Sequence, residues 1–225
     1  MKAAVLREFN KDLEIETLDI PALGEGQVLV DIKFSGICGA QVNQKKGIKI
    51  KKQFLPCLMG HEGSGIIVDV GKNVSTVQKG DHVVMHWRKS EGIESEFPTY
   101  FSKTSNQQIG SGLITTFSDM SVVSENRVTK INKKHSLEVA SLLGCAVTTG
   151  FGVINNELKP DEGGTFLISG VGGVGISSII GAKLNNAKKI IAIDINEEKL
   201  NFSKKIGSTH QIVYKKNNKI EFKNL

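Results

Sequence analysis

Short runs in which apolar and polar residues alternate dominate the first 150 residues of the chain. Gly-rich turn signals such as Gly71-Lys72-Asn73 and Lys79-Gly80-Asp81 separate these runs. The runs are Lys2–Arg7, Leu13–Leu18, Val28–Phe34, Ser64–Val70, His82–Met85 and Ser118–Val123. A period of two with frequent turns is typical of β-strands, so we expect residues 1–150 to form an irregular β-barrel-like domain.

The pattern changes after Leu137, and the remaining segments alternate between strand-like and helix-like character. Two helical segments come first, Glu138–Leu143 and Val147–Asn155. The strands and helices that follow alternate in the order Thr165–Ser169, Val174–Leu184, Lys189–Asp194, Glu197–Ile206 and Gln211–Tyr214. This alternation predicts the first half of a doubly wound parallel sheet, so residues 151–225 are expected to be an incomplete nucleotide-binding domain in an α/β protein.

A Gly-x-Gly-x-x-Gly pattern lies between the first strand and helix of that second domain. Gly170 permits the tight turn, Gly172 lets the backbone approach a pyrophosphate, and Gly175 lets the helix pack close to the strand. Asp194, at the end of the next strand, can accept hydrogen bonds from the ribose hydroxyls and would repel a 2′-phosphate. The pattern therefore predicts binding of NAD rather than NADP. The alternative is an ordinary Gly-rich turn with Asp194 as a strand-end cap.

The composition narrows the class of protein. The formal net charge is +6, and the excess lies in residues 183–225, where ten lysines are mixed with asparagines and with few aromatic residues. Such a segment is typical of solvated helix faces rather than of a nucleic-acid-binding surface. We identify neither a signal peptide nor a membrane span, and we expect a cytoplasmic protein. The three cysteines are too few for a disulfide scaffold and are expected to be thiols.

Three residues that are far apart in the sequence are candidate metal ligands. Cys38 follows a predicted strand, His61 lies in Gly60-His61-Glu62-Gly63, and Cys145 follows Gly144. Two thiolates and one imidazole form a suitable zinc set, and three protein ligands leave a fourth position for water or substrate. Spacing alone cannot show that they converge. Packed core thiols and a hydrogen-bonded histidine remain the alternative.

The chain resembles the zinc-containing alcohol dehydrogenases of the medium-chain dehydrogenase/reductase superfamily from Met1 to about Tyr214. The resemblance rests on several motifs in the same order: Gly36-Ile37-Cys38-Gly39, Gly60-His61-Glu62-Gly63-Ser64-Gly65, Gly80-Asp81, Gly144-Cys145 through Thr149-Gly150, and Gly170–Gly175. It implies a GroES-like barrel followed by a Rossmann domain. It also implies hydride transfer between NAD and a small alcohol, aldehyde or ketone, and a homo-oligomer for the full-length form.

The resemblance also assigns roles to individual residues. It implies that Cys38, His61 and Cys145 hold a catalytic zinc ion, and that Glu62 is a carboxylate behind the zinc that can exchange onto it. The residues that it places at the cofactor are Thr149 against the nicotinamide, the turn residues Gly170, Gly172, Gly173, Val174 and Gly175 at the phosphates, and Asp194 and Lys199 near the adenosine ribose. Lys199 is equally explained as an exposed helix lysine.

The sequence departs from the family pattern at several positions. The segment Trp87–Phe117 contains no cysteine, so we expect one zinc ion, no structural zinc, and a loop held by other means or flexible. Ala40, Gln41 and Asn43 replace residues that relatives use near the first cysteine ligand and in proton transfer. His86 could serve in a proton path, although a structural role fits its position beside Trp87 better.

The chain also ends earlier than its relatives, as expected for a sequence fragment or a natural truncation. Two other functions stay open. One is a zinc-free quinone or enoyl reductase of the same fold, and the other is a non-catalytic remnant.

Overall fold

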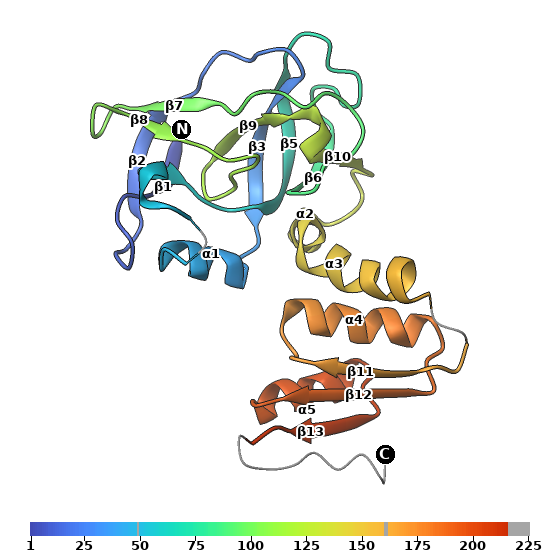
Figure 1. The fold of residues 1–225 in the computed structure, drawn as a ribbon. Coiled ribbons are helices and arrows are strands. Elements are labelled where there is room, and N and C mark those ends of the chain that lie inside the picture. The colour runs from blue at the N-terminus through green and yellow to red at the C-terminus, as the bar shows by residue number, and fades with distance from the viewer. Residues whose placement is uncertain (49, 160–161, 216–225) are drawn as a thin grey trace. The chain divides into compact units, whose positions relative to one another are not determined.

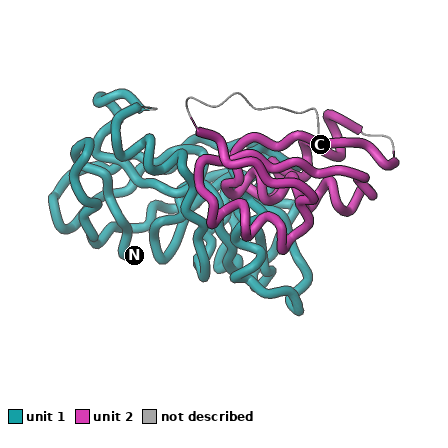
Figure 2. Tube along the Cα trace, turned by 90° about the horizontal axis from the view of Figure 1, so that it is seen from below, with its two compact units in different colours: residues 1–145 teal, residues 146–225 magenta. Residues whose placement is uncertain are grey.

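The computed structural model describes residues 1–48, 50–159 and 162–215, and the chain divides into two compact units. The first unit is Met1–Cys145, and the second begins at Ala146 (Figure 2). The sequence places this boundary after residue 150. The structure places it five residues earlier, because helix α3 (Ala146–Gly152) packs against helix α4 (Gly173–Leu184) of the second unit.

The first unit contains a closed barrel in which the strand order is β1-β2-β7-β8-β4. The strands are β1 (Lys2–Leu6), β2 (Glu14–Asp19), β7 (Thr99–Ser102), β8 (Gln107–Gly110) and β4 (Cys57–Leu58). Val5, Leu18, Tyr100 and Ile109 are almost fully buried inside it. The residues that follow Leu18, Tyr100 and Ile109 are exposed, as expected for strands with one buried face, whereas Leu6, which follows Val5, is buried in a second cluster.

A five-stranded antiparallel sheet completes the first unit (Figure 1). Its order is β10 (Val128–Ile131), β6 (His82–His86), β5 (Glu62–Val70), β3 (Gln27–Ser35) and β9 (Met120–Ser124). Val28, Val30, Ile67, Val83 and Met85 form its core. The β-rich first domain that the sequence predicts is confirmed. Strands β4, β7, β8 and β10 and helix α1 (Gly39–Lys45) were not predicted, because strands of two to four residues and a helix of seven residues are too short to show a clear period.

The helical segments that lie between β10 and β11 in the chain are less regular than the sequence suggests. The helix expected at Glu138–Leu143 is a short α2 (Leu137–Ala140) followed by a 3₁₀ turn, η3 (Ser141–Gly144). In the second unit, the helix expected at Val147–Asn155 begins as α3 and continues as a π-helical segment, η4 (Val153–Leu158). Further 3₁₀ turns are η1 (Lys52–Phe54) and η2 (Glu125–Arg127) in the first unit.

The second unit contains three parallel strands with helices packed on the sheet. Strands β11 (Thr165–Ser169), β12 (Lys189–Asp194) and β13 (His210–Val213) lie in that order, joined by α4 and α5 (Glu197–Ile206). Residues at alternate strand positions, such as Phe166 and Ile168, pack with Ile179 of α4 and Leu200 of α5. This is the first half of a doubly wound sheet, as predicted. The end of the basic C-terminal segment, residues 216–225, lies outside the described residues.

A buried acid anchors the loop between β6 and β7. The Glu125 side chain is fully buried and accepts hydrogen bonds from the backbone N–H groups of Ile93, at 3.0 Å, and of Ser75 and Thr76, both at 2.9 Å. Beside it, Arg127 forms an ion pair with Glu94 of the loop at 2.6 Å. This loop lies in the cysteine-free segment, and these polar contacts hold it against the sheet.

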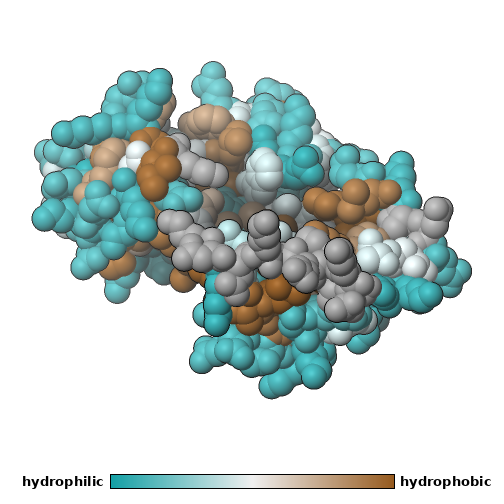
Figure 3. Space-filling model, turned by 60° about the horizontal axis from the view of Figure 1, so that its bottom comes forward, coloured by the Kyte–Doolittle hydropathy of each residue, from teal (hydrophilic) through white to brown (hydrophobic). Residues whose placement is uncertain are grey.

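The face drawn in Figure 3 is mostly hydrophilic where it is coloured, with a few apolar areas. No single helix among the described residues is both long and apolar enough to cross a membrane. Two consecutive helical stretches, Leu137–Gly144 and Ala146–Leu158, meet the length and hydropathy requirement only when they are taken together.

We expect replacement of Glu125 by Gln to destabilise the first unit by about 1–3 kcal/mol, because an amide group cannot accept from all the N–H donors that surround this carboxylate. Burial raises the pKa of Glu125, but the hydrogen bonds from Ile93, Ser75 and Thr76 outweigh it and hold the pKa below its ordinary value. A lowered pKa stabilises the fold above the pKa of the unfolded chain, and this contribution disappears as the pH falls through the folded-state pKa. Urea unfolding at pH 7 and pH 4 measures both effects. The exposed Glu8→Gln variant is the control, and equal stability of Glu125→Gln and wild type at pH 7 would contradict the expectation.

Candidate metal centre and dinucleotide site

Cys38 lies at the N-cap of α1, in the loop that follows β3. Gly36 precedes it in a buried position where a Cβ atom would lie 2.7 Å from the Glu62 carboxylate. Only glycine therefore lets the chain turn past Glu62 at this point. The backbone N–H of Cys38 donates to Oε1 of Gln41 at 2.8 Å, which fixes the first turn of the helix.

His61 lies immediately before β5, and Gln41 connects it to Cys38. Gln41 is only 4% exposed, and its Nε2 atom lies in hydrogen-bond contact with Nδ1 of His61. One amide side chain thus contacts the backbone of the cysteine and the ring of the histidine. Sequence reasoning noted Gln41 only as a departure from a family pattern. Its position as a bridge depends on α1, which the sequence did not predict.

Cys145 ends the 3₁₀ turn η3, at the end of the first unit. Gly144 makes its approach possible, because a Cβ atom at this position would lie 2.2 Å from the Met85 carbonyl oxygen and 2.8 Å from Cβ of Glu62. Glu62, the first residue of β5, is 2% exposed and lies close enough to Cys145 to affect its charge. The Trp87 indole, a pure donor, hydrogen-bonds to the Cys145 sulfur.

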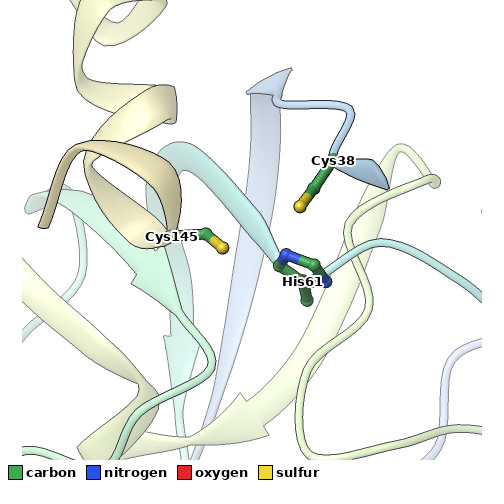
Figure 4. A group of neighbouring side chains, drawn as sticks. All are labelled: Cys38, His61 and Cys145. Atoms are coloured by element: carbon green, nitrogen blue, oxygen red, sulfur yellow. The ribbon is translucent and has the colours of Figure 1, made fainter. Parts of the chain in front are cut away.

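The structure brings Cys38, His61 and Cys145 together from three distant segments (Figure 4). One ligand atom from each, the two sulfurs and a ring nitrogen, all lie within 4.8 Å of one another, and each residue is at least partly buried. Burial, and then the neighbouring Cys38 and Glu62, raise the pKa of Cys145 to about 12. The site thus gathers groups that would repel one another as anions.

This donor set fits a zinc ion. Ligand atoms on a tetrahedral zinc site lie about 3.8 Å apart, given zinc–sulfur bonds of about 2.3 Å. The observed upper limit of 4.8 Å is within roughly 1 Å of that spacing. A divalent cation would also remove the repulsion that raises the pKa of Cys145, because it stabilises the thiolate form of a coordinating sulfur. The residues present can therefore hold the metal that the sequence suggests.

His86 and Cys57, two further residues of the first unit, lie outside the cluster of Cys38, His61 and Cys145. Both ring nitrogens of His86 are engaged, Nδ1 with the Arg88 carbonyl oxygen at 2.7 Å and Nε2 with Oγ1 of Thr129 at 2.9 Å. Burial lowers the pKa of His86. These contacts favour a structural role for this side chain over a place in a proton path. Cys57 is a buried thiol on β4 that lies outside the cluster, and burial raises its pKa.

The Gly-rich turn of the second unit joins β11 to the N-terminus of α4. Gly170 has a φ of +90°, a conformation that favours glycine. A Cβ atom on Gly175 would lie 1.9 Å from the Gly170 carbonyl oxygen, so a larger residue would push the helix away from the turn. Gly172, Gly173 and Val174 form the N-cap and first residues of α4, where backbone N–H groups are available to an anion.

Asp194 lies at the C-terminal end of β12 beside this turn. Its Oδ2 atom accepts the Val171 N–H at 2.7 Å and its Oδ1 atom accepts the Asn196 N–H at 2.9 Å, and these bonds lower its pKa. Gly170, Asp194 and Tyr214 line a cavity of about 340 Å³. The charge of Lys199 lowers the pKa of Asp194 further, so this lysine lies on the same side of the unit. Thr149 lies on α3, next to Gly150, which approaches α4 closely at Ser177.

Known proteins match this chain in sequence. Residues 24–133 match the alcohol dehydrogenase GroES-like domain family. An S-(hydroxymethyl)glutathione dehydrogenase of Synechocystis sp. is 33% identical over 92% of this chain, and one of Saccharomyces cerevisiae is 33% identical over the same share. The chain covers 62% and 60% of the lengths of these two relatives.

Solved structures match the fold as well. An alcohol dehydrogenase zinc-binding domain protein from Burkholderia ambifaria matches 94% of this chain with a TM-score of 0.84 and 27% identity. Benzyl alcohol dehydrogenase from Acinetobacter calcoaceticus matches 93% with a TM-score of 0.79 and 28% identity. The chain covers 63% and 62% of those two proteins. The motifs, the two units and these similarities agree: the first unit contains an alcohol dehydrogenase GroES-like domain, and more than nine tenths of the chain is similar to part of known alcohol dehydrogenases.

Proposed function

We propose that this protein is a zinc-dependent oxidoreductase that transfers hydride between NAD(H) and a primary or secondary alcohol or the matching carbonyl compound. The observation that carries the proposal is the convergence of two sulfurs and one imidazole nitrogen within 4.8 Å. We assign Cys38, His61 and Cys145 as the ligands of one zinc ion. Three protein ligands leave the fourth position of a tetrahedral site for the substrate oxygen, which is the arrangement of catalytic zinc.

Each residue of the site has a defined part in this reaction. Zinc, when bound, supplies the Lewis acidity that lowers the pKa of an alcohol toward neutrality. Gln41 orients the His61 ring through its contact with Nδ1, and we assign the other ring nitrogen to the ion. Glu62 adds negative charge behind the ligands. Trp87 positions the Cys145 sulfur by its hydrogen bond.

The second unit supplies the cofactor-binding groups in this proposal. The turn residues Gly170–Gly175 offer N–H groups to the pyrophosphate at the positive end of α4. Asp194, held ionised by two backbone N–H groups, accepts the ribose hydroxyls and disfavours a 2′-phosphate. Thr149 is assigned to the nicotinamide side and Lys199 to the ribose side. A homo-oligomer for the full-length form and a cytoplasmic location stay predictions.

Two other functions compete with this one. A zinc-free quinone or enoyl reductase of the same fold would not need two cysteines at one point, and the close approach of Cys38 and Cys145 supports the zinc enzyme instead. A non-catalytic remnant would bind metal without turnover. NAD reduction in the presence of a panel of alcohols separates that possibility from the enzyme.

We expect Cys145→Ala to reduce bound zinc at least about tenfold, because a site with only Cys38 and His61 loses a thiolate and its closed geometry. Elemental analysis of the purified, dialysed chain measures the ion, with an expected content near one per wild-type chain. Cys57→Ala removes a buried thiol of the same unit outside the cluster and should retain the ion. A full zinc ion in folded Cys145→Ala would refute the ligand assignment.

Gln41→Ala should weaken zinc binding by about 10–100-fold, because the His61 ring loses the group that orients it. Gln41→Glu should bind at least as tightly as wild type, since its two oxygens can accept both the Cys38 N–H and a proton on Nδ1 of His61. A competition titration with a chromophoric chelator gives the affinities. Gln44→Ala, on the same helix but in contact with Cys57, is the control. An unchanged affinity in Gln41→Ala would show that the contact does not orient the ligand.

Asp194→Asn should narrow the preference for NADH over NADPH by at least about tenfold, because the charge that repels a 2′-phosphate is lost. Calorimetric titration with each nucleotide measures the ratio. Glu198→Gln removes a charge of the same sign from the first turn of α5 and tests whether general electrostatics explains the change. The assignment fails if both variants shift the ratio equally.

A further inference from the structure

One segment of the first unit, residues 42–54, combines positive charge with exposed apolar side chains, and we call it the basic segment. It spans the end of α1 and the 3₁₀ turn η1, and it contains five lysines and no Asp or Glu. Residues 8–12, which pack beside it, add two acids and one lysine. The neighbourhood therefore keeps an excess of positive charge.

Core contacts fix the backbone of the basic segment. Ile50 and Phe9 pack against the buried cluster that contains Leu6. The backbone N–H of Asn10 donates to the carbonyl oxygen of Lys45 at 2.8 Å, which joins the end of α1 to the neighbouring loop. Because these inward contacts hold the segment, its outward side chains present a defined surface.

The lysines of this surface have few counter-charges. Lys46, Lys51 and Lys52 are exposed, and none of the ion pairs found among the described residues involves them. Lys45 forms an ion pair with Asp12 at 2.9 Å. Three ammonium groups are thus available to an anionic partner.

Exposed apolar side chains lie among these lysines. Ile48, Phe54 and Val42 expose 68%, 56% and 47% of their surfaces. Val42 and Lys46 lie on the same face of α1, because the Lys46 N–H donates to the Val42 carbonyl oxygen one turn earlier. Phe54 also lines a cavity of about 740 Å³ that His61 lines, but Ile48 and Val42 do not. Single exposed apolar residues are common, whereas several within a charged segment indicate an interaction surface.

The mixture of charge and apolar surface identifies the partner that fits. A nucleic acid binds through cationic and stacking side chains, but the basic segment contains no Arg and only one aromatic residue, Phe54. A bilayer with anionic lipids fits both features. Its headgroups attract lysines, and the boundary between headgroups and acyl chains accepts side chains such as Ile48 and Phe54.

We infer that the basic segment docks on the surface of an anionic lipid bilayer. Lys46, Lys51 and Lys52 contact the headgroups, and Ile48 and Phe54 enter the boundary between the headgroups and the acyl chains. Charge complementarity carries the choice of partner, and the few side chains involved make the attachment peripheral and reversible. This inference goes beyond the proposed dehydrogenase function and does not depend on it.

Flotation of the full chain with lipid vesicles tests the inference. We expect the floated fraction to be at least about fivefold larger with phosphatidylcholine mixed with phosphatidylserine than with phosphatidylcholine alone, because lysines near a surface respond to its negative potential. High salt should release the chain, since it screens exposed charges. Equal flotation with both vesicles would overturn the inference. Retention on heparin without flotation would also overturn it, because the partner would then be a soluble polyanion.

A pair of lysine substitutions tests the charge. Lys51→Gln together with Lys52→Gln should reduce flotation with the anionic vesicles at least about fivefold. Lys133→Gln together with Lys134→Gln is the matched control, because these two lysines are also adjacent, exposed and in the first unit. The control should float like wild type. An equal loss in both double variants would show that overall charge, and not the basic segment, sets the binding.

A pair of isoleucine substitutions tests the apolar contact at constant charge. Ile48→Ser should reduce flotation about threefold or more, because the bilayer loses the apolar area that this side chain buries. Ile15→Ser is the matched control, since Ile15 is also 68% exposed but lies on β2 outside the basic segment. Urea unfolding shows that both variants are folded. Full flotation of Ile48→Ser would contradict entry of this side chain into the bilayer and overturn the inference.

Discussion

Two thiols and a carboxylate lie together at one point of the barrel unit, and this concentration of acidic groups is the constraint on which the proposed site depends. The sulfurs of Cys38 and Cys145 approach within 4.8 Å, and Glu62 lies beside them. Burial and mutual repulsion raise the pKa of Cys145 to about 12. A protein gains nothing from such an arrangement unless a cation compensates it, and a divalent metal ion does so most directly.

Close backbone packing makes this arrangement possible. Gly36 and Gly144 are both positions where a Cβ atom would collide with Glu62 or with the strand next to it. The absence of side chains there lets the loop after β3 and the turn η3 reach the start of β5. The antiparallel pairing of β3 with β5, and of β5 with β6, then fixes where those segments begin and end. The absence of side chains at these two glycines therefore allows the close approach of Cys38 and Cys145, the proposed ligands, to the start of β5.

Buried polar contacts support the surrounding loop. Glu125 accepts the Ile93 N–H of the loop between β6 and β7 and the Ser75 and Thr76 N–H groups of the segment between β5 and β6. Arg127 pairs with Glu94 of the loop between β6 and β7. The loop also carries Phe97, which lines the cavity near the proposed zinc ligands. Glu94, Glu125 and Arg127 do not line that cavity, and their contacts hold the loop that carries Phe97.

The sequence by itself determined the elements with strong periodicity and the residues with rare chemistry. Strands β11 and β12 and the helix α5 span the residues that their patterns predict, because each is a complete apolar run bounded by turn signals. The Gly170–Gly175 turn and Asp194 were also predicted from the sequence, because the backbone of such a turn requires glycines at a fixed spacing. The identity of Cys38, His61 and Cys145 as candidates followed from side-chain chemistry and from a family resemblance.

Only the tertiary structure decided how these residues meet. Three ligands separated by long stretches of chain converge through strand pairing, which a linear pattern does not specify. Gln41 bridges Cys38 and His61 only because α1 is in place, and Glu125 anchors the loop only because the 3₁₀ turn η2 lies against it. The structure places the boundary between the units after Cys145 and not after residue 150. Helix α3 packs on α4, and the local pattern of apolar and polar residues does not show this contact. Local periodicity is encoded in neighbouring residues, whereas contacts across a barrel depend on the arrangement of the whole unit.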